Sequence, residues 1–120
     1  MKKFYNSTKY AVAGLIHFAR TDRNGQIEIV CAIIAILLGF YLNIDSTEWG
    51  LIIICIGAVL SAEMFNHAIE KTNDFISKDH HKEIGQIKDV AASAVMMTVF
   101  MSLVMCYIVF YSKIVARFFN

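Results

Sequence analysis

The sequence predicts an all-α membrane protein: three transmembrane helices preceded by an N-terminal amphipathic helix, in a single membrane domain. Of the 120 residues, 58% are hydrophobic, 18% are charged and none is proline. Soluble domains are typically about 45–50% apolar and about 25% charged. Residues 29–44 and 90–112 contain no charge, and a third apolar run covers residues 49–62. These three runs make the bilayer the expected solvent.

Residues 1–22 have the periodicity of an amphipathic helix. Phe4 and Leu15 fall on one helical face, and Lys9 and His17 fall on the other. The segment has no unbroken apolar core of ~7–15 residues, so it is not expected to be a signal peptide. We expect it to lie at the membrane surface.

The three spans are expected at about residues 26–44, 48–70 and 88–112. A hydrocarbon core of ~30 Å requires about 20 helical residues at ~1.5 Å each. The apolar run 49–62 is too short for this. The middle span must therefore continue through Glu63, which brings a carboxylate to the membrane or its border.

Lysine and arginine residues predict the orientation. The link after the first span has none, whereas the N-terminal stretch contains both and the second link (71–88) contains four lysines. The positive-inside rule then places the N-terminus and the second link in the cytoplasm, with the protein in the inner (plasma) membrane. Lys113 and Arg117 near the C-terminus are a minority against it. Asp45 and Glu48 have the spacing of a capping box for the second span.

Several classes of protein are disfavoured. The chain has 11 basic and 10 acidic residues, not the strong basic excess typical of nucleic-acid binding. It contains no GxxxxGK[ST], GxGxxG, HExxH, GxSxG or CxxC motif. His67 and Glu70 form one H-x-x-E pair, whereas a di-iron bundle needs such pairs on two helices. The cysteines stand alone in apolar runs and are expected to be buried hydrophobic residues, namely Cys31, Cys55 and Cys106.

A polar stripe follows one face of the second span. At 100° per residue, Glu63, Asn66, Glu70 and Asp74 fall within about 80° of one another. A carboxylate at the centre of a transmembrane helix costs ~2.5–3.5 kcal/mol, so such residues are usually functional. The stripe therefore indicates a polar site at the cytoplasmic third of the span.

The residue types in and near this stripe suit metal-assisted phosphoryl transfer. Carboxylates are hard oxygen ligands for Mg²⁺, and a carboxylate in an apolar setting can act as a general base. Lys88 could bind phosphate, next to Asp89 at the start of the third span. Asp22 and Glu28 add two acids near the start of the first span. An enzyme of this kind and a non-enzymatic subunit or pore both remain open, although a pore would need polar residues along a whole span.

The sequence resembles the prokaryotic integral-membrane diacylglycerol kinases and their undecaprenol kinase relatives. The segment 63–74 (EMFNHAIEKTND) is similar to the family's E-x-x-N-x-A-I-E-x-x-x-D. KDVAASAV at 88–95 follows at the family's spacing, and RTDRN at 20–24 looks like the acidic segment before the first span. The resemblance covers almost the whole chain.

The resemblance implies an ATP- and Mg²⁺-dependent lipid kinase, with diacylglycerol converted to phosphatidate or, alternatively, undecaprenol to undecaprenyl phosphate. It implies Glu63 as the general base and Asn66 as the residue that helps to place it, with Glu70 and Asp22 as metal ligands. It also implies a homotrimer with active sites shared between subunits and no nucleic-acid partner. The residues that it implies for the nucleotide site are Lys88, Asp89, Tyr10, Glu28, Asp79, His81 and Lys3.

The chain departs from the family pattern at a few of these positions. Asp22 stands where the family usually has Glu, and His67 stands where a small Ser or Thr is common. Lys3 is at best a substitute for an N-terminal arginine that contacts nucleotide. The role of His67 stays open at this point.

Overall fold

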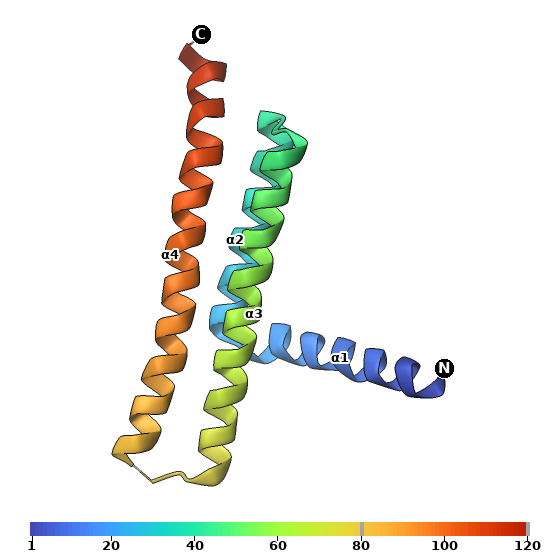
Figure 1. The fold of residues 1–120 in the computed structure, drawn as a ribbon, viewed down its shortest axis with the longest axis vertical. Coiled ribbons are helices and arrows are strands. Elements are labelled where there is room, and N and C mark those ends of the chain that lie inside the picture. The colour runs from blue at the N-terminus through green and yellow to red at the C-terminus, as the bar shows by residue number, and fades with distance from the viewer. Residues whose placement is uncertain (80, 120) are drawn as a thin grey trace.

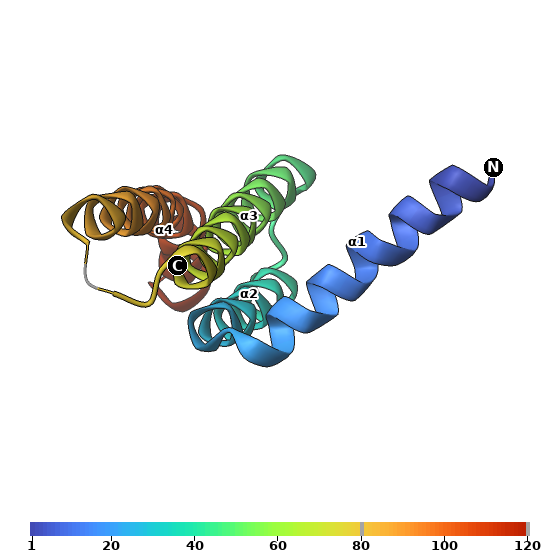
Figure 2. The same ribbon diagram turned by 90° about the horizontal axis from the view of Figure 1, so that it is seen from below.

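The computed structural model describes residues 1–79 and 81–119, and these form four helices. They are α1 (Lys2–Thr21), α2 (Arg23–Leu42), α3 (Ser46–Ile76) and α4 (Lys82–Phe119). α2, α3 and α4 run alongside one another, and α1 projects sideways from the start of α2, at a level that α3 and α4 extend past (Figures 1 and 2). α2, α3 and α4 are each long and apolar enough to cross a membrane. The structure confirms the predicted all-α class with three membrane spans.

α3 and α4 extend beyond the predicted spans at both ends, whereas α2 begins before the predicted first span and ends two residues short of it. α3 covers residues 46–76 instead of 48–70, and α4 covers 82–119 instead of 88–112. At ~1.5 Å per residue, α3 is about 46 Å long, more than the ~30 Å of a hydrocarbon core. Hydropathy therefore located the spans but not the polar turns that continue the helices past the membrane.

A one-residue corner separates α1 from α2. Asp22 is extended (φ −96°, ψ 116°), and its Oδ2 accepts a 2.6 Å hydrogen bond from the Gly25 backbone N–H. This N-cap starts α2 at Arg23, three residues before the predicted position. Phe18 is buried over Gly25, where a Cβ atom would overlap the aromatic ring. The close approach makes glycine necessary at this corner.

The link between α2 and α3 is equally short. α2 ends at Asn43 in the left-handed conformation (φ 51°), and Asp45 caps α3. Asp45 Oδ1 accepts the backbone N–H groups of Thr47 at 2.8 Å and Glu48 at 3.0 Å, and Glu48 Oε2 accepts the Asp45 N–H at 2.8 Å. The predicted capping box is confirmed.

The buried apolar core lies at this same end of the bundle. It is a small cluster drawn from the end of α2, the α2–α3 link, α3 and α4, and its members are Leu42, Ile44, Ile52, Val109 and Phe110. Most other large apolar side chains on α2, α3 and α4 are exposed in the single chain. Such a surface requires lipid or other apolar partners around it.

Two contacts at this end involve the C-terminal cations. Lys113 Nζ lies 3.1 Å from Glu48 Oε2, and the Arg117 guanidinium lies 4.6 Å from the centre of the Tyr41 ring. The first contact joins the end of α4 to the start of α3, and the second joins it to the end of α2. Lys113 therefore has a nearby counter-charge and Arg117 an aromatic partner.

Candidate active site

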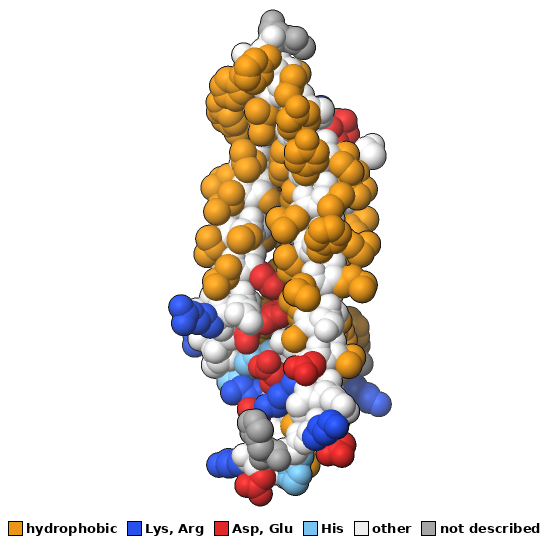
Figure 3. Space-filling view, turned by 90° about the vertical axis from the view of Figure 1, so that its left-hand side faces the viewer, with side chains coloured by type: hydrophobic (Ala, Val, Ile, Leu, Met, Phe, Trp, Pro, Cys, Tyr) orange, Lys and Arg blue, Asp and Glu red, His pale blue; other side chains and the backbone are white. Residues whose placement is uncertain are grey.

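The polar side chains gather at the end of the bundle opposite the core. In the space-filling view, apolar side chains cover the upper part of the molecule and charged ones the lower part (Figure 3). Glu63 and Asn66 lie at this boundary on α3 and are only 1% and 5% exposed. In the described part of the chain, Glu63 Oε1 and Asn66 Oδ1 are buried and have no hydrogen-bond partner. Buried oxygens without donors are rare in proteins and are a feature of sites that bind a ligand.

Side chains from α2 and from further along α3 surround the Glu63 carboxylate. Asn24 and Asn66 approach it, and its charge interacts with those of Asp22 and Glu70. Glu28 on α2 interacts in turn with Glu63, and Glu28 Oε2 is also buried, without a hydrogen-bond partner among the residues that the structure describes. The structure therefore brings together two pairs of acids from distant parts of the sequence.

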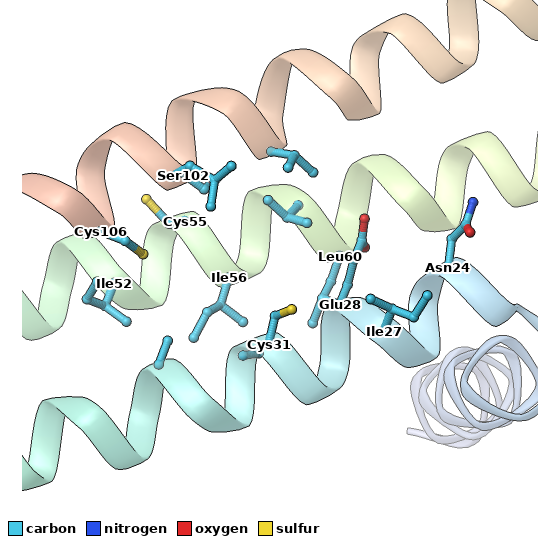
Figure 4. Close-up of a pocket in the computed structure, with 15 residues that line it drawn as sticks. Asn24, Ile27, Glu28, Cys31, Ile52, Cys55, Ile56, Leu60, Ser102 and Cys106 are labelled. Atoms are coloured by element: carbon cyan, nitrogen blue, oxygen red, sulfur yellow. The ribbon is translucent and has the colours of Figure 1, made fainter.

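An apolar cavity of about 370 Å³ opens beside this cluster between α2, α3 and α4. Asn24 and Glu28 lie toward one end of the cavity in Figure 4, and apolar side chains such as Ile52 and Leu60 line the rest. The three isolated cysteines also line it. A polar group at one end of an apolar cavity suits a ligand with a polar head and an apolar body.

His67 lies next to this cluster and contacts Asp22. The His67 Nδ1 and Asp22 Oδ1 atoms are 2.7 Å apart. Its position beside the polar stripe was visible in the sequence, but its partner lies 45 residues away and was not predicted. Asn73 was missed altogether and is 7% exposed. Its spacing of seven residues from Asn66, the same spacing that separates Glu63 from Glu70, could have identified it.

The oxygens of this cluster are of the type that Mg²⁺ prefers, although the described residues contain no group of three or more His, Cys, Asp or Glu side chains arranged to hold a metal ion. Glu63, Asn66 and Glu28 each contribute a buried oxygen without a hydrogen-bond donor in the described chain, and Glu70 is half-buried one turn beyond Asn66. Carboxylate and amide oxygens are the hard ligands that Mg²⁺ prefers, together with water and substrate phosphates. Both Asp22 oxygens already accept hydrogen bonds, from Gly25 and His67. An Asp22 ligand would have to use its further lone pairs.

The candidate phosphate-binding residues lie farther toward the α3–α4 loop. Lys88 Nζ forms a 2.6 Å ion pair with Asp74 Oδ1, so the structure joins the polar stripe of α3 to the start of α4. Asp89 is exposed, as are Asp79 and His81 in the loop. These side chains are free to contact a ligand that approaches from solvent.

The structure does not bring the remaining candidates together with Lys88. Lys3 and Tyr10 are exposed on α1, and α1 points away from α4 in both ribbon views (Figures 1 and 2). A single chain therefore cannot place Tyr10 beside Lys88 in this arrangement. A site that uses both would need a second copy of the chain.

Known proteins resemble this chain over most of its length. A family model described as prokaryotic diacylglycerol kinase matches residues 9–110. A protein named undecaprenol kinase from Bacillus subtilis is 33% identical over 114 residues, 95% of this chain and 93% of its own. Proteins named diacylglycerol kinase are similar as well. The one from Helicobacter pylori strain J99 is 33% identical over 94 residues (78% and 73% of the two chains), and that from Escherichia coli K12 is 27% identical over 85 (71% and 70%).

Proposed function

Because the chain belongs to the prokaryotic diacylglycerol kinase family, and is thus a multi-pass membrane lipid kinase, we propose that it transfers phosphate to the hydroxyl group of a membrane lipid and that Glu63 takes part in this transfer. The observation that carries this assignment is the buried Glu63 carboxylate, with an oxygen that has no partner in the described chain, close to the polar end of an apolar cavity. The cavity suits the apolar body of the lipid, and the carboxylate suits its hydroxyl.

Glu63 acts as the general base in this proposal. It takes the proton from the lipid hydroxyl as that oxygen attacks the γ-phosphorus of ATP, and ADP leaves with the bond electrons. Asn66 and Asn24 approach the carboxylate and orient it. Since Glu63 is almost completely buried, water competes poorly for its free oxygen.

Glu70 and Asp22 are the proposed ligands of the Mg²⁺ that accompanies ATP. When bound, the ion neutralises charge on the transferred phosphoryl group. Glu70 and Asp22 both interact with the Glu63 charge, so these two residues would hold the metal close to the base. Glu28, with a buried oxygen that has no partner within residues 1–79 and 81–119, is the proposed link between this cluster and the nucleotide.

Lys88 and Asp89 are proposed to contact the nucleotide phosphates, with Asp79 and His81 lining the nucleotide site. Lys88 would exchange Asp74 for a phosphate when nucleotide binds. Tyr10 and Lys3 would come from a neighbouring subunit of a homotrimer, because α1 points away from α4 in the single chain. The exposed side chains of Ala92, Ser93 and Ala94 would allow close helix contact between subunits.

Two lipid acceptors are candidates. Diacylglycerol is the acceptor in the family's name, and undecaprenol is favoured by the relative from Bacillus subtilis, which matches more of this chain than the Helicobacter pylori and Escherichia coli relatives do. Both have one free hydroxyl on a long apolar body. A pore is not proposed, because the buried polar residues Glu63, Asn66 and Asn73 all lie in the half of α3 next to the α3–α4 loop, and most charged side chains in Figure 3 lie toward the same end. The basic loop between α3 and α4 favours a cytoplasmic site in the inner membrane.

The test is transfer of labelled phosphate from ATP in detergent micelles. The purified protein is offered diacylglycerol and undecaprenol in separate reactions, with and without Mg²⁺. We expect Mg²⁺-dependent label in one or both lipids, and the ratio of the two kcat/KM values names the acceptor. Absence of label in both lipids would contradict the proposed reaction.

A further inference from the structure

We infer that His67 is a positioning residue of the proposed metal site: it holds the Asp22 carboxylate at the corner between α1 and α2. This inference rests on the proposed function, because it takes Asp22 to be a metal ligand. His67 belongs to α3, the helix that also carries Glu63 and Glu70. It therefore connects Asp22, at the start of α2, to the helix that carries the proposed base.

The contact between the two side chains is short and shielded. His67 Nδ1 lies 2.7 Å from Asp22 Oδ1, and the side chains are 13% and 12% exposed. An ionised carboxylate can only accept, so Nδ1 carries the proton and donates it. Hydrogen bonds to an ionised acceptor are shorter and stronger than those between neutral groups.

The corner holds both partners in one orientation. Asp22 Oδ2 accepts the Gly25 N–H at 2.6 Å, so each carboxylate oxygen has its own donor and the plane of the group is set. The His67 ring meets Phe18 edge to face, with ring centres 5.9 Å apart at 75°. Phe18 is itself buried over Gly25. The imidazole thus has packing on one side and a carboxylate on another.

The second nitrogen of His67 is not explained by a structural role alone. Nε2 is buried and has no partner in the described part of the chain. With the proton on Nδ1, Nε2 is a lone-pair acceptor, and a buried acceptor without a donor disfavours folding. A contact needed only for stability would be served better by a side chain without this extra atom. A histidine here is consistent with a site that also contains water or substrate donors when occupied.

The inference is tested by two variants that each keep only one property of His67, either its ring or its hydrogen-bond donor. His67→Phe keeps a ring against Phe18 and removes the donor to Asp22. His67→Asn places an amide N–H near the position of Nδ1 and removes the ring. The binding of Mn²⁺ with a non-hydrolysable ATP analogue is followed by electron paramagnetic resonance, and the dependence of kcat and KM on Mg²⁺ is measured in parallel.

We expect His67→Phe to weaken Mn²⁺ binding about tenfold or more, as is typical when an outer partner of a metal ligand is lost. We expect kcat at saturating Mg²⁺ to change much less, and His67→Asn to recover most of the affinity. His17→Phe, at an exposed histidine of α1, is the matched control and should bind Mn²⁺ like the unchanged protein. Wild-type affinity in His67→Phe, or no recovery in His67→Asn, would overturn the inference.

Two further measurements separate this inference from the proposed function. If Asp22→Asn leaves Mn²⁺ binding unchanged, the metal role of Asp22 is wrong and the inference goes with it. If Asp22→Asn weakens binding and His67→Phe does not, only the role of His67 is wrong. ¹⁵N chemical shifts of labelled histidine in the unchanged protein give a test that does not depend on how a variant folds: we expect the proton of His67 on Nδ1, and a proton on Nε2 alone would refute the contact.

Discussion

Replacing Glu63 by Gln removes one property of the site and almost nothing else. Gln has the shape of Glu, so no cavity forms around a side chain that is 1% exposed. Asn24 and Asn66 can still approach an amide oxygen. The exchange also removes a buried oxygen that has no donor in the described chain. What the protein loses is the ability to accept a proton from the lipid hydroxyl.

The expected effect follows from this burial. Removing a general base typically slows a reaction about 10²–10⁴-fold, and at ~1.36 kcal/mol per tenfold this raises the barrier by about 3–5 kcal/mol. Water cannot easily take over, because the carboxylate is buried. Thermal stability should stay the same or rise, since an incompletely paired buried charge is replaced by a neutral amide.

Labelled phosphate transfer in micelles measures turnover, and binding of a non-hydrolysable ATP analogue reports on the intact site. Glu48→Gln is the matched control, because Glu48 lies at the opposite end of the same helix and takes part in the capping box and the Lys113 ion pair. That control should lose stability and keep its kcat. If Glu63→Gln kept a kcat within about threefold of the unchanged protein, a far smaller loss than general-base removal causes, Glu63 would not be the base.

Three other predictions concern the metal, the corner and the cap. Glu70→Gln should raise the Mg²⁺ concentration for half-maximal activity about 10-fold or more with little change in helix content, and an unchanged Mg²⁺ titration would argue against Glu70 as a ligand. Gly25→Ala should destabilise the protein by about 1–3 kcal/mol, because its Cβ overlaps a buried ring; Gly14→Ala, with open space around it, should be neutral or stabilising in the same thermal-unfolding assay. The pKa of Asp45 is lowered chiefly by the Glu48 backbone N–H, so its stabilising effect is present at neutral pH and is lost as the pH falls through the lowered value. Asp45→Ala should therefore unfold at a lower temperature than the unchanged protein at pH 7, and the difference between the two unfolding temperatures should become smaller as the pH falls. A difference that does not depend on pH would show that the ionised Asp45 carboxylate is not what stabilises the helix end.

Much of the fold could be predicted because it depends on local properties. Charge-free runs locate the spans, and the spacing of Asp45 and Glu48 identifies a capping box from four residues of sequence. The stripe from Glu63 to Asp74 needs only helical periodicity, so the helix that carries the proposed base was identified without coordinates. The helix ends were less predictable, because polar turns outside the membrane leave no hydropathy signal.

The site beyond this one helix depends on contacts between distant residues. The approach of Glu28 to Glu63, the 2.7 Å contact of Asp22 with His67 and the Lys88–Asp74 ion pair all join different helices or their links. Helical periodicity predicts which residues share a face, but it does not say which face of a neighbouring helix is opposite.

The sequence by itself determined that this protein is a three-span membrane protein with acids forced into its second span, because hydropathy, charge and helical period act along the chain. Only the tertiary structure decided which side chains meet Glu63, and that Asp22 is held at a corner by His67 and Gly25. The physical reason is that burial and hydrogen bonding between helices depend on the packing of whole surfaces. At the corner between α1 and α2, this packing depends on Gly25, because only a residue without a Cβ atom leaves room for the Phe18 ring.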